Sequence, residues 1–437
     1  MKTTPYWWDD GAPCPDLPRT PPDNADVLIV GAGFTGLSAA IWASRGGAAV
    51  TVVDAGVPGE GASTRNGGMA GAHPRLSLSA TAARWGHDTA VAMFNEAHAA
   101  YDHLAGLIDD FAIDCDYTLT GRIQLAWTAA DFAAQKAMAA DMARDTRFPV
   151  EIVERRNLGQ HIATRRYFGG LYYPTHGALH PRKLHDGLMA AALDLGVTVV
   201  GNCPIWDIAP RGGGHEARHP GGTIIADKVI LATNGYTSGG GVFRWLRRRV
   251  FPLPSFIVAT EQLSPNLVAA LAPGGRMMVE TRARHSYFRV SPDGTRILWG
   301  GRASMTPISA ETAAARLRSS IEDIWPDLKD VRLTHSWTGN TGFAFEQSPH
   351  VGVRDGVHFA MGYCGGGVVL APYLGMKAAH QALGNHRGQT AYTATEFATR
   401  PWHPGGRPWF LYGANAWFTQ VVDRRQNAAA ARDRAGS

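Results

Sequence analysis

The stretch that decides the fold is residues 26–40, DVLIVGAGFTGLSAA. An apolar run of strand type leads into Gly31, Gly33 and Gly36, and a helical pattern follows these glycines. In such a Gly-x-Gly-x-x-Gly turn the first glycine permits the tight bend, the second lets the backbone approach a pyrophosphate, and the third allows close packing of helix on strand. We therefore predict an α/β fold with a Rossmann-like dinucleotide-binding domain.

The second strand supports the same interpretation. Residues 51–53 follow a Gly46-Gly47 helix stop and end at Asp54. An acid about 20 residues after the glycines is placed to accept a hydrogen bond from a ribose hydroxyl. The spacing fits FAD and NAD equally well.

Composition excludes several classes of protein. The chain has 437 residues, 45% of them hydrophobic, so it exceeds one ordinary domain of about 100 to 200 residues. Residues 1–10 hold no continuous apolar segment and no run of 18 apolar residues occurs, so we expect a cytoplasmic protein without a membrane partner. The net charge of +5 is dispersed and accompanies no nucleic-acid-binding module, so no nucleic-acid partner is expected. The four cysteines are far apart and form no Cys-x-x-Cys pair, so we predict neither disulfides nor a cysteine metal site. The histidines show no His-Glu-x-x-His spacing, so no metal site is predicted from them either.

The order of strands, glycine turns and helices predicts a discontinuous nucleotide-binding domain. Two further strand and helix pieces follow the first one, around residues 177–200 and 358–383. The segments between the pieces contain amphipathic helices and alternating strands, and we expect them to form one α+β substrate domain with a large mixed or antiparallel sheet. The predicted parts are an N-terminal arm, 1–24; the nucleotide-binding domain, 25–84, 176–239 and 331–385; the substrate domain, 85–175 and 240–330; and a C-terminal extension, 386–437, whose end at 427–432 is expected to be frayed.

The loop after Asp54 carries a family resemblance. Residues 59–68, GEGASTRNGG, resemble the loop of the gamma-glutamylputrescine oxidase branch of the D-amino-acid oxidase superfamily of flavoenzymes. The aromatic arm at 6–8, YWW, and the tail segment 406–411, GRPWFL, are similar to the same branch. The resemblance covers most of the chain and implies FAD and a GR2-type flavoprotein fold.

The resemblance also implies which residues contact FAD. In the family the Ser-x-Arg-Asn-Gly-Gly loop passes beside the flavin, although a solvent loop turned by its glycines is the structural alternative. The cofactor candidates are Gly31, Gly33, Phe34, Thr35, Gly36, Asp54, Ala55, Ser63, Thr64, Arg65, Asn66, Gly67, Gly68, Val199, Thr233, Asn234, Gly235, Gly339, Gly362, Cys364, Gly365, Gly366, Gly367 and Val368.

A second family turn stands at residues 362–367, GYCGGG. It resembles a Gly-x-Ser-Gly-His-Gly turn that places a helix N-terminus at the pyrimidine end of the flavin, with Cys364 and Gly366 in place of the usual Ser and His. Cys364 is either a reactive thiol or an inert small side chain. Relatives that tether the flavin use a His in the early loop or a Cys in a later one, whereas this chain has Arg65 and the segment 338–342, TGNTG. We therefore predict non-covalent FAD.

The resemblance implies oxidation of a C–N bond in a primary or secondary amine or amino acid. In the reaction that the resemblance implies, hydride would pass to flavin N5, the imine would hydrolyse, and O2 would be reduced to H2O2. Candidates for the substrate wall are His73, Tyr287, Arg289 and Tyr363. Tyr287 and Arg289 share a strand face, so together they fit a substrate carboxylate or phosphonate, or else Arg289 simply solvates an exposed strand.

The electron acceptor is left open by the sequence. Sarcosine-oxidase relatives place a Lys near flavin N5 on the strand before a Gly, and the matching segment here, 297–301, reads ILWGG. A dehydrogenase, a biosynthetic tailoring flavoenzyme and a flavin subunit of a partner complex are therefore the alternatives to an oxidase.

Overall fold

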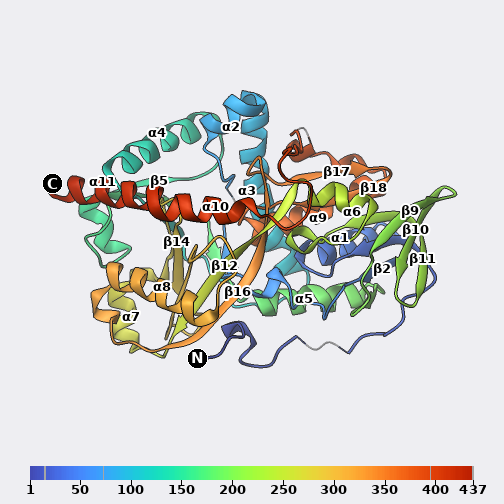
Figure 1. The fold of residues 1–437 in the computed structure, drawn as a ribbon, viewed down its shortest axis with the longest axis horizontal. Helices are drawn as coiled ribbons and strands as arrows, with labels where there is room; N and C mark the ends of the chain where they lie inside the picture. Colours follow the sequence, from blue (N-terminus) through green and yellow to red (C-terminus); the bar gives the residue numbers. More distant parts are fainter. Residues whose placement is uncertain (14–15, 72, 394, 436–437) are drawn as a thin grey trace.

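Two large sheets organise the chain in the computed structural model, which describes residues 1–13, 16–71, 73–393 and 395–435. Figure 1 shows the first sheet with its helices on one side of the molecule and the second sheet on the other. Each sheet has eight strands among the described residues. This mixed α/β architecture confirms the predicted fold class.

The first sheet is built on a parallel core in the order β18-β11-β1-β2-β8. An antiparallel strand, β17, lies beside β18, and a hairpin of β9 and β10 extends β11. The strands are β1 (Asn24–Val30), β2 (Val50–Val53), β8 (Thr198–Val200), β9 (Asp207–Arg211), β10 (Gly214–His219), β11 (Gly222–Leu231), β17 (His350–Arg354) and β18 (Val357–Met361). The four residues of β2 are all buried, as expected of a parallel strand covered on both faces.

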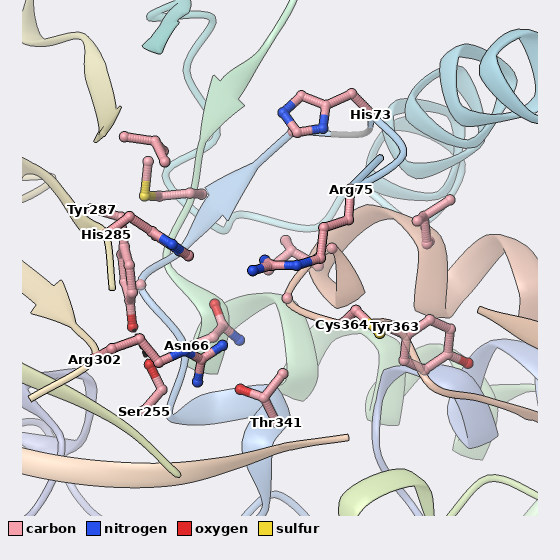
Figure 2. A pocket seen from close by; sticks show the side chains of 18 of the residues that line it. Asn66, His73, Arg75, Ser255, His285, Tyr287, Arg302, Thr341, Tyr363 and Cys364 are labelled. Carbon is pink, nitrogen blue, oxygen red and sulfur yellow. Dashed lines mark hydrogen bonds between the residues drawn. The ribbon is translucent and has the colours of Figure 1, made fainter. Parts of the chain in front are cut away.

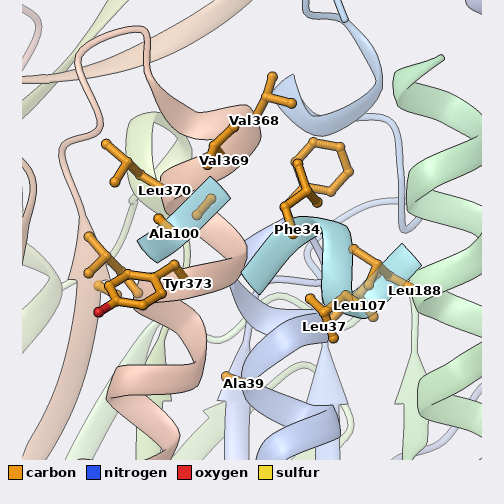
Figure 3. Close-up of a cluster of buried hydrophobic side chains, with 14 of the residues drawn as sticks. Phe34, Leu37, Ala39, Ala100, Leu107, Leu188, Val368, Val369, Leu370 and Tyr373 are labelled. Carbon is orange, nitrogen blue, oxygen red and sulfur yellow. The ribbon is translucent and has the colours of Figure 1, made fainter. Parts of the chain in front are cut away.

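Helix α1 (Phe34–Arg45) lies against α9 (Gly367–Ala382) in the core of this part. Small residues permit the close approach, since a Cβ on Gly375 would lie 2.2 Å from the carbonyl oxygen of Thr35. The Ser38 hydroxyl donates to the Pro372 carbonyl at 2.6 Å. Figure 3 shows Phe34 and Leu37 of α1 in the same apolar cluster as side chains of α9 and α3 (His87–Asp110). The packing fixes the start of both glycine-led helices near one another.

The second sheet runs β16-β12-β15-β14-β13-β4-β6-β5 and is antiparallel except between β13 and β4. Its strands are β4 (Arg122–Leu125), β5 (Glu151–Glu154), β6 (Gly169–Tyr173), β12 (Val250–Thr260), β13 (Met277–Glu280), β14 (Ser286–Val290), β15 (Ile297–Gly301) and β16 (Leu333–Ala344). Helix α8 (Ala310–Ile324) contributes to the core on this side.

The remaining elements are a two-stranded sheet and several helices. The small sheet pairs β3 (Met69–Ala70) with β7 (Gly177–Ala178) in antiparallel register. The remaining helices are η1 (Tyr6–Trp8), η2 (Ala62–Thr64), α2 (Leu78–Trp85), α4 (Ala129–Asp145), η3 (Arg155–Gln160), α5 (Pro181–Asp194), η4 (Asn234–Tyr236), α6 (Gly241–Arg247), α7 (Pro265–Leu271), η5 (Pro273–Gly275), η6 (Pro326–Leu328), η7 (His386–Gly388), η8 (Ala391–Thr393), α10 (Phe410–Trp417), η9 (Phe418–Val422) and α11 (Asp423–Ala435). No helix of the described residues has the length and apolar character needed to cross a membrane.

Three sequence predictions need correction. Strand β16 lies within the segment 331–385 assigned to the first domain, yet it pairs along its length with β12 of the second sheet. Helix α3, assigned to the substrate domain, packs in the first core because Met93, Phe94 and Ala97 repeat at helical spacing. The tail expected to be frayed is helix α11, whose Ala430 is fully buried.

Candidate functional site: two joined cavities

Two adjoining cavities lie between the glycine turns and the second sheet. The glycine-turn cavity, about 440 Å³, is lined by the β1–α1 turn, the end of β2 and the segment after β11. The sheet cavity, about 460 Å³, is lined by strands β12, β13 and β14 and by the loop after β3. They share the lining residues Ala62, Arg65, Asn66, Thr341, Tyr363, Gly365 and Val368. A long ligand can therefore extend from one cavity into the other.

The first turn requires its glycines. Gly31 has a φ of 109°, and a Cβ there would lie 2.9 Å from the carbonyl oxygen of Ala232. A Cβ on Gly36 would lie 1.8 Å from the Gly31 carbonyl oxygen, so α1 can pack on β1 only with glycine at that position. Gly33 is the N-cap of α1 and lines the cavity. The positive end of the helix dipole thus faces the space where an anionic group would bind.

Asp54 anchors this turn from the end of β2. Its carboxylate accepts the backbone N–H of Ala32 at 2.8 Å and that of Gly56 at 3.1 Å. Burial raises the pKa of the Asp54 carboxyl, and the two N–H donors oppose that shift. An ionised carboxylate has about four acceptor sites, so Asp54 retains capacity for a ligand hydroxyl in the cavity that it lines.

The loop at 59–68 is held in shape by its own polar side chains. The Ser63 hydroxyl accepts the N–H of Phe34 at 3.0 Å, which ties the loop to the start of α1. Asn66 donates to the Ser63 carbonyl at 2.8 Å and accepts the N–H of Gly68 at 2.8 Å. The Arg65 guanidinium donates to the Glu60 carbonyl at 2.6 Å. The Asn66 side chain therefore stabilises the conformation of the loop.

The N-terminal arm covers this loop. The Trp7 indole N–H donates to the Asn66 carbonyl at 2.7 Å, and Trp7 is 2% exposed. The Trp8 indole N–H donates to the Thr64 hydroxyl at 3.0 Å, and the Arg65 guanidinium lies 4.5 Å from the Trp8 ring centre. The arm thus packs against the loop whose Arg65 and Asn66 line both cavities.

Most cofactor candidates line one cavity or both. These are Gly31, Gly33, Phe34, Thr35, Asp54, Ala55, Ser63, Arg65, Asn66, Gly67, Thr233, Asn234, Gly339, Cys364, Gly365, Gly366, Gly367 and Val368. Their contact with a cofactor stays a prediction. The candidates that line neither cavity are Gly36, Thr64, Gly68, Val199, Gly235 and Gly362. They stand in packing positions; Val199, for example, is fully buried in β8.

The surroundings of Cys364 favour an inert thiol. It is 3% exposed, its sulfur donates to the Gly362 carbonyl at 3.1 Å, and the N–H of Ala344 donates to the sulfur at 3.4 Å. Burial raises the pKa of the Cys364 thiol to about 11. The thiolate that would react is therefore scarce at neutral pH, which favours the second of the two alternatives.

Arg289 does not reach the sheet cavity, and both predictions for it are wrong. It is 4% exposed, and its Nη1 donates to the carbonyls of Gly68 at 2.7 Å and Leu179 at 2.8 Å. The carbonyls of Gly68 and Leu179 occupy Nη1, and the Val290 carbonyl accepts from Nε at 2.9 Å. Arg289 neither faces solvent nor is available to a substrate carboxylate.

The other wall candidates do line the sheet cavity. The Tyr287 hydroxyl shares a hydrogen bond with Ser255 at 2.8 Å, and that of Tyr363 shares one with Thr35 at 2.7 Å. Burial, with the nearby Arg122 charge, lowers the pKa of His73 to about 3. His73 is therefore neutral across the ordinary pH range.

Sequence reasoning missed Arg75 and Arg302, two of the arginines that line the sheet cavity. Figure 2 shows Arg75 and Arg302 directed into the same space from different walls. Arg75 donates to Gln347 at 3.1 Å and Arg302 to the Pro254 carbonyl at 3.2 Å, and neither forms an ion pair with any described carboxylate. Burial and the charge of Arg75 lower the pKa of Arg302 to about 10. The cavity is therefore positively charged.

The sequence offered a signal for Arg302 only, which is a positively charged residue at the end of a predicted strand. Arg302 directly follows the predicted strand 297–301, whereas Arg75 stands in a loop without a recognisable pattern. His285, also unpredicted, has its pKa held well below the usual value by burial and by these two arginines. No cluster of three or more potential metal-ligating His, Cys, Asp or Glu side chains occurs in the part of the chain that the structure describes.

Comparisons with known proteins agree with this geometry. Residues 26–381 match the DAO family model, described as FAD dependent oxidoreductase. The chain is 32% identical over 400 residues to the probable oxidoreductase OrdL of Rhizobium meliloti (strain 1021), covering 90% of this chain and 91% of that protein. It is 27% identical to the gamma-glutamylputrescine oxidoreductase of Escherichia coli (strain K12), with 88% and 89% covered. The crystal structure of glycine oxidase from Geobacillus kaustophilus superimposes with a TM-score of 0.72 at 22% identity, covering 87% of this chain and 99% of that one.

Proposed function

The chain belongs to the DAO family of FAD dependent oxidoreductases, and from this premise we propose that it oxidises the C–N bond of an amine or amino acid that carries an anionic group. The observation that carries the proposal is the pair Arg75 and Arg302, directed without a carboxylate partner into the sheet cavity. The cavity adjoins the glycine-turn cavity directly.

The glycine-turn cavity fits FAD by its donor set. The α1 N-terminus and Gly33 would hold the pyrophosphate, and Asp54 would accept from the ribose. The N-terminus of α9, at Gly366 and Gly367, would hold the pyrimidine end of the flavin. When bound, FAD supplies the acceptor of the hydride that leaves the amine carbon. With Cys364 buried and protonated, we propose that FAD is held without a covalent bond.

The protein's own residues bind and orient the amine. Arg75 and Arg302 would pair with the anionic group and fix one end of the substrate. The positive charges of the two arginines disfavour a further cation, the ammonium form of the substrate. They therefore lower the pKa of the bound ammonium and favour the neutral amine. A neutral amine has the lone pair that must form the imine as hydride departs.

The relatives support an amine substrate, because one is a gamma-glutamylputrescine oxidoreductase and another, 24% identical, is the glycine oxidase of Geobacillus kaustophilus. We propose O2 as the electron acceptor, with H2O2 as product.

One observation favours a dehydrogenase instead. No lysine, the residue that sarcosine-oxidase relatives place near flavin N5, stands among the described residues that line the sheet cavity.

Anaerobic bleaching of the flavin near 450 nm tests the proposal. The purified yellow protein is mixed without oxygen with gamma-glutamyl amines, N-methyl amino acids, D-amino acids, aminodicarboxylates and uncharged alkylamines. Bleaching by an anionic amine and not by the alkylamine is expected. Admission of air then separates an oxidase, which recovers its colour at once, from a dehydrogenase. Bleaching by none of the amines would overturn the proposed function.

A further inference from the structure

Arg122 also lines the sheet cavity, from strand β4. Arg122 begins β4, is 7% exposed, and lies with its guanidinium 4.4 Å from the ring centre of Tyr173. Its Nε and Nη2 have no hydrogen-bond partner among the described residues, and it forms no ion pair there. A buried guanidinium with two unpaired donors is rare, because an unpaired buried charge costs folding free energy.

The residues around Arg122 are also unpaired. The Tyr173 hydroxyl and both ring nitrogens of His176 have no hydrogen-bond partner among the described residues. Tyr173 and His176 stack at 4.9 Å, and His73 lies 5.2 Å from Tyr173. We call His73, Arg122, Tyr173 and His176 the Arg122 cluster. Five polar atoms of this cluster, from Arg122, Tyr173 and His176, are buried without partners.

Arg122 supplies the only charge of these four side chains near neutral pH. Burial and the Arg122 charge hold the pKa of His73 at about 3 and that of His176 well below its usual value. The cation–π contact with Tyr173 offsets part of the cost of burial, but it leaves the N–H donors unused. The cluster therefore lacks an anion that accepts hydrogen bonds.

Arg122 and His73 of the cluster line the same cavity as Arg75 and Arg302, whereas Tyr173 and His176 do not line it. Arg122 begins β4 and Arg302 follows β15, so the two arginines come from different strands. The charges of both Arg122 and Arg75 contribute to the lowered pKa of His73. One substrate in this cavity can therefore contact both positive regions.

We propose that the Arg122 cluster is a second anion-binding subsite and that the substrate is an amine bearing two anionic groups. One group binds between Arg75 and Arg302, and the other pairs with the Arg122 guanidinium. N-carboxyalkyl amino acids and aminodicarboxylates are the chemical classes that fit. The inference rests on the proposed function for the amine, but binding of two anions can be measured without turnover.

Calorimetric titration of the FAD-loaded enzyme with unreactive acids tests the subsite. Malonate, succinate, glutarate and adipate are compared with monocarboxylates of the same chain length. We expect one dicarboxylate length to bind at least about 10-fold more tightly than its monocarboxylate, since each charged hydrogen-bonded pair adds to affinity. Arg122→Met should abolish that advantage and leave monocarboxylate binding unchanged, whereas Arg302→Met should weaken both.

Two controls separate loss of binding from loss of folding. Arg211→Gln changes an exposed arginine on the β9–β10 hairpin and should leave all affinities unchanged. Arg122→Lys retains the charge and should restore part of the dicarboxylate preference if Arg122→Met does not load FAD. Equal affinity for both acid series in the wild type would overturn the inference, and so would a preference that survives in Arg122→Met. If dicarboxylates bind as expected but no amine bleaches the flavin, the proposed function fails while the subsite stands.

Discussion

Arg302 and Arg75 face one volume although their charges repel each other. Such an arrangement is stable when an anion binds between them. We predict that Arg302→Met raises the KM for an anionic amine by at least about 10-fold, the loss of one charged hydrogen-bonded contact, with a smaller effect on kcat. Steady-state kinetics with the best substrate of the panel measures the change, and Arg211→Gln serves as the control. An unchanged KM would remove Arg302 from the site.

The reactivity of the Cys364 thiol can also be tested. Because burial raises the pKa of its thiol to about 11, we predict no alkylation by iodoacetamide at pH 8 in the folded enzyme. Peptide mapping by mass spectrometry, with an unfolded sample as the positive control, measures the modified fraction. Rapid alkylation of Cys364 in the folded protein would show a reactive thiol.

The sequence correctly placed residues whose positions depend on neighbours in the chain. Gly31, Gly33 and Asp54 occupy their expected places because the strand–turn–helix pattern fixes them. Arg289 could not be placed, since its acceptors are carbonyls 221 and 110 residues away in the chain. Arg75 was missed for the same reason: only the fold brings its loop to the sheet cavity.

The N-terminal arm holds the loop at 59–68, which lines the proposed cofactor cavity. Trp7→Phe keeps the ring but removes the donor to the Asn66 carbonyl, which costs about 1 kcal/mol. We therefore predict about a 5-fold weaker affinity for FAD, measured by the fluorescence of released flavin. The matched control is Trp409→Phe, because Trp409 also donates to a backbone carbonyl but is 59% exposed. Equal loss of FAD from both variants would contradict the role of the arm.

Elements with a strong local pattern were predicted well. The strand predicted to carry Tyr287 and Arg289 is β14, and the helix of the piece predicted around residues 358–383 is α9. Strand β16 was assigned to the wrong sheet because its pairing with β12 is set by contacts distant in sequence. The low-complexity tail forms α11 because tertiary contacts hold it, including the hydrogen bond of the Trp127 indole to Asn427 at 3.2 Å.

The molecule as a whole buries neutral histidines, and this gives its stability a pH dependence. His176 is 1% exposed and its folded pKa lies well below 6.5, so below pH 6.5 the unfolded chain binds more protons than the folded one. Stability is then lost as pH falls from about 6.5, by up to about 1.4 kcal/mol per pH unit for His176. We predict that His176→Phe reduces this slope between pH 6.5 and 5, measured by urea unfolding. Identical slopes would contradict a neutral buried His176.

We propose a single reaction at the two joined cavities, in which an anionic amine loses two electrons to bound FAD. The most direct measurement is an anaerobic single turnover, in which the bleached flavin and the carbonyl product are quantified together. The account predicts one carbonyl product and one released ammonia or amine for each FAD reduced, with the FAD set free intact by acid precipitation. Bleaching without a carbonyl product, or no bleaching by any anionic amine, would contradict it.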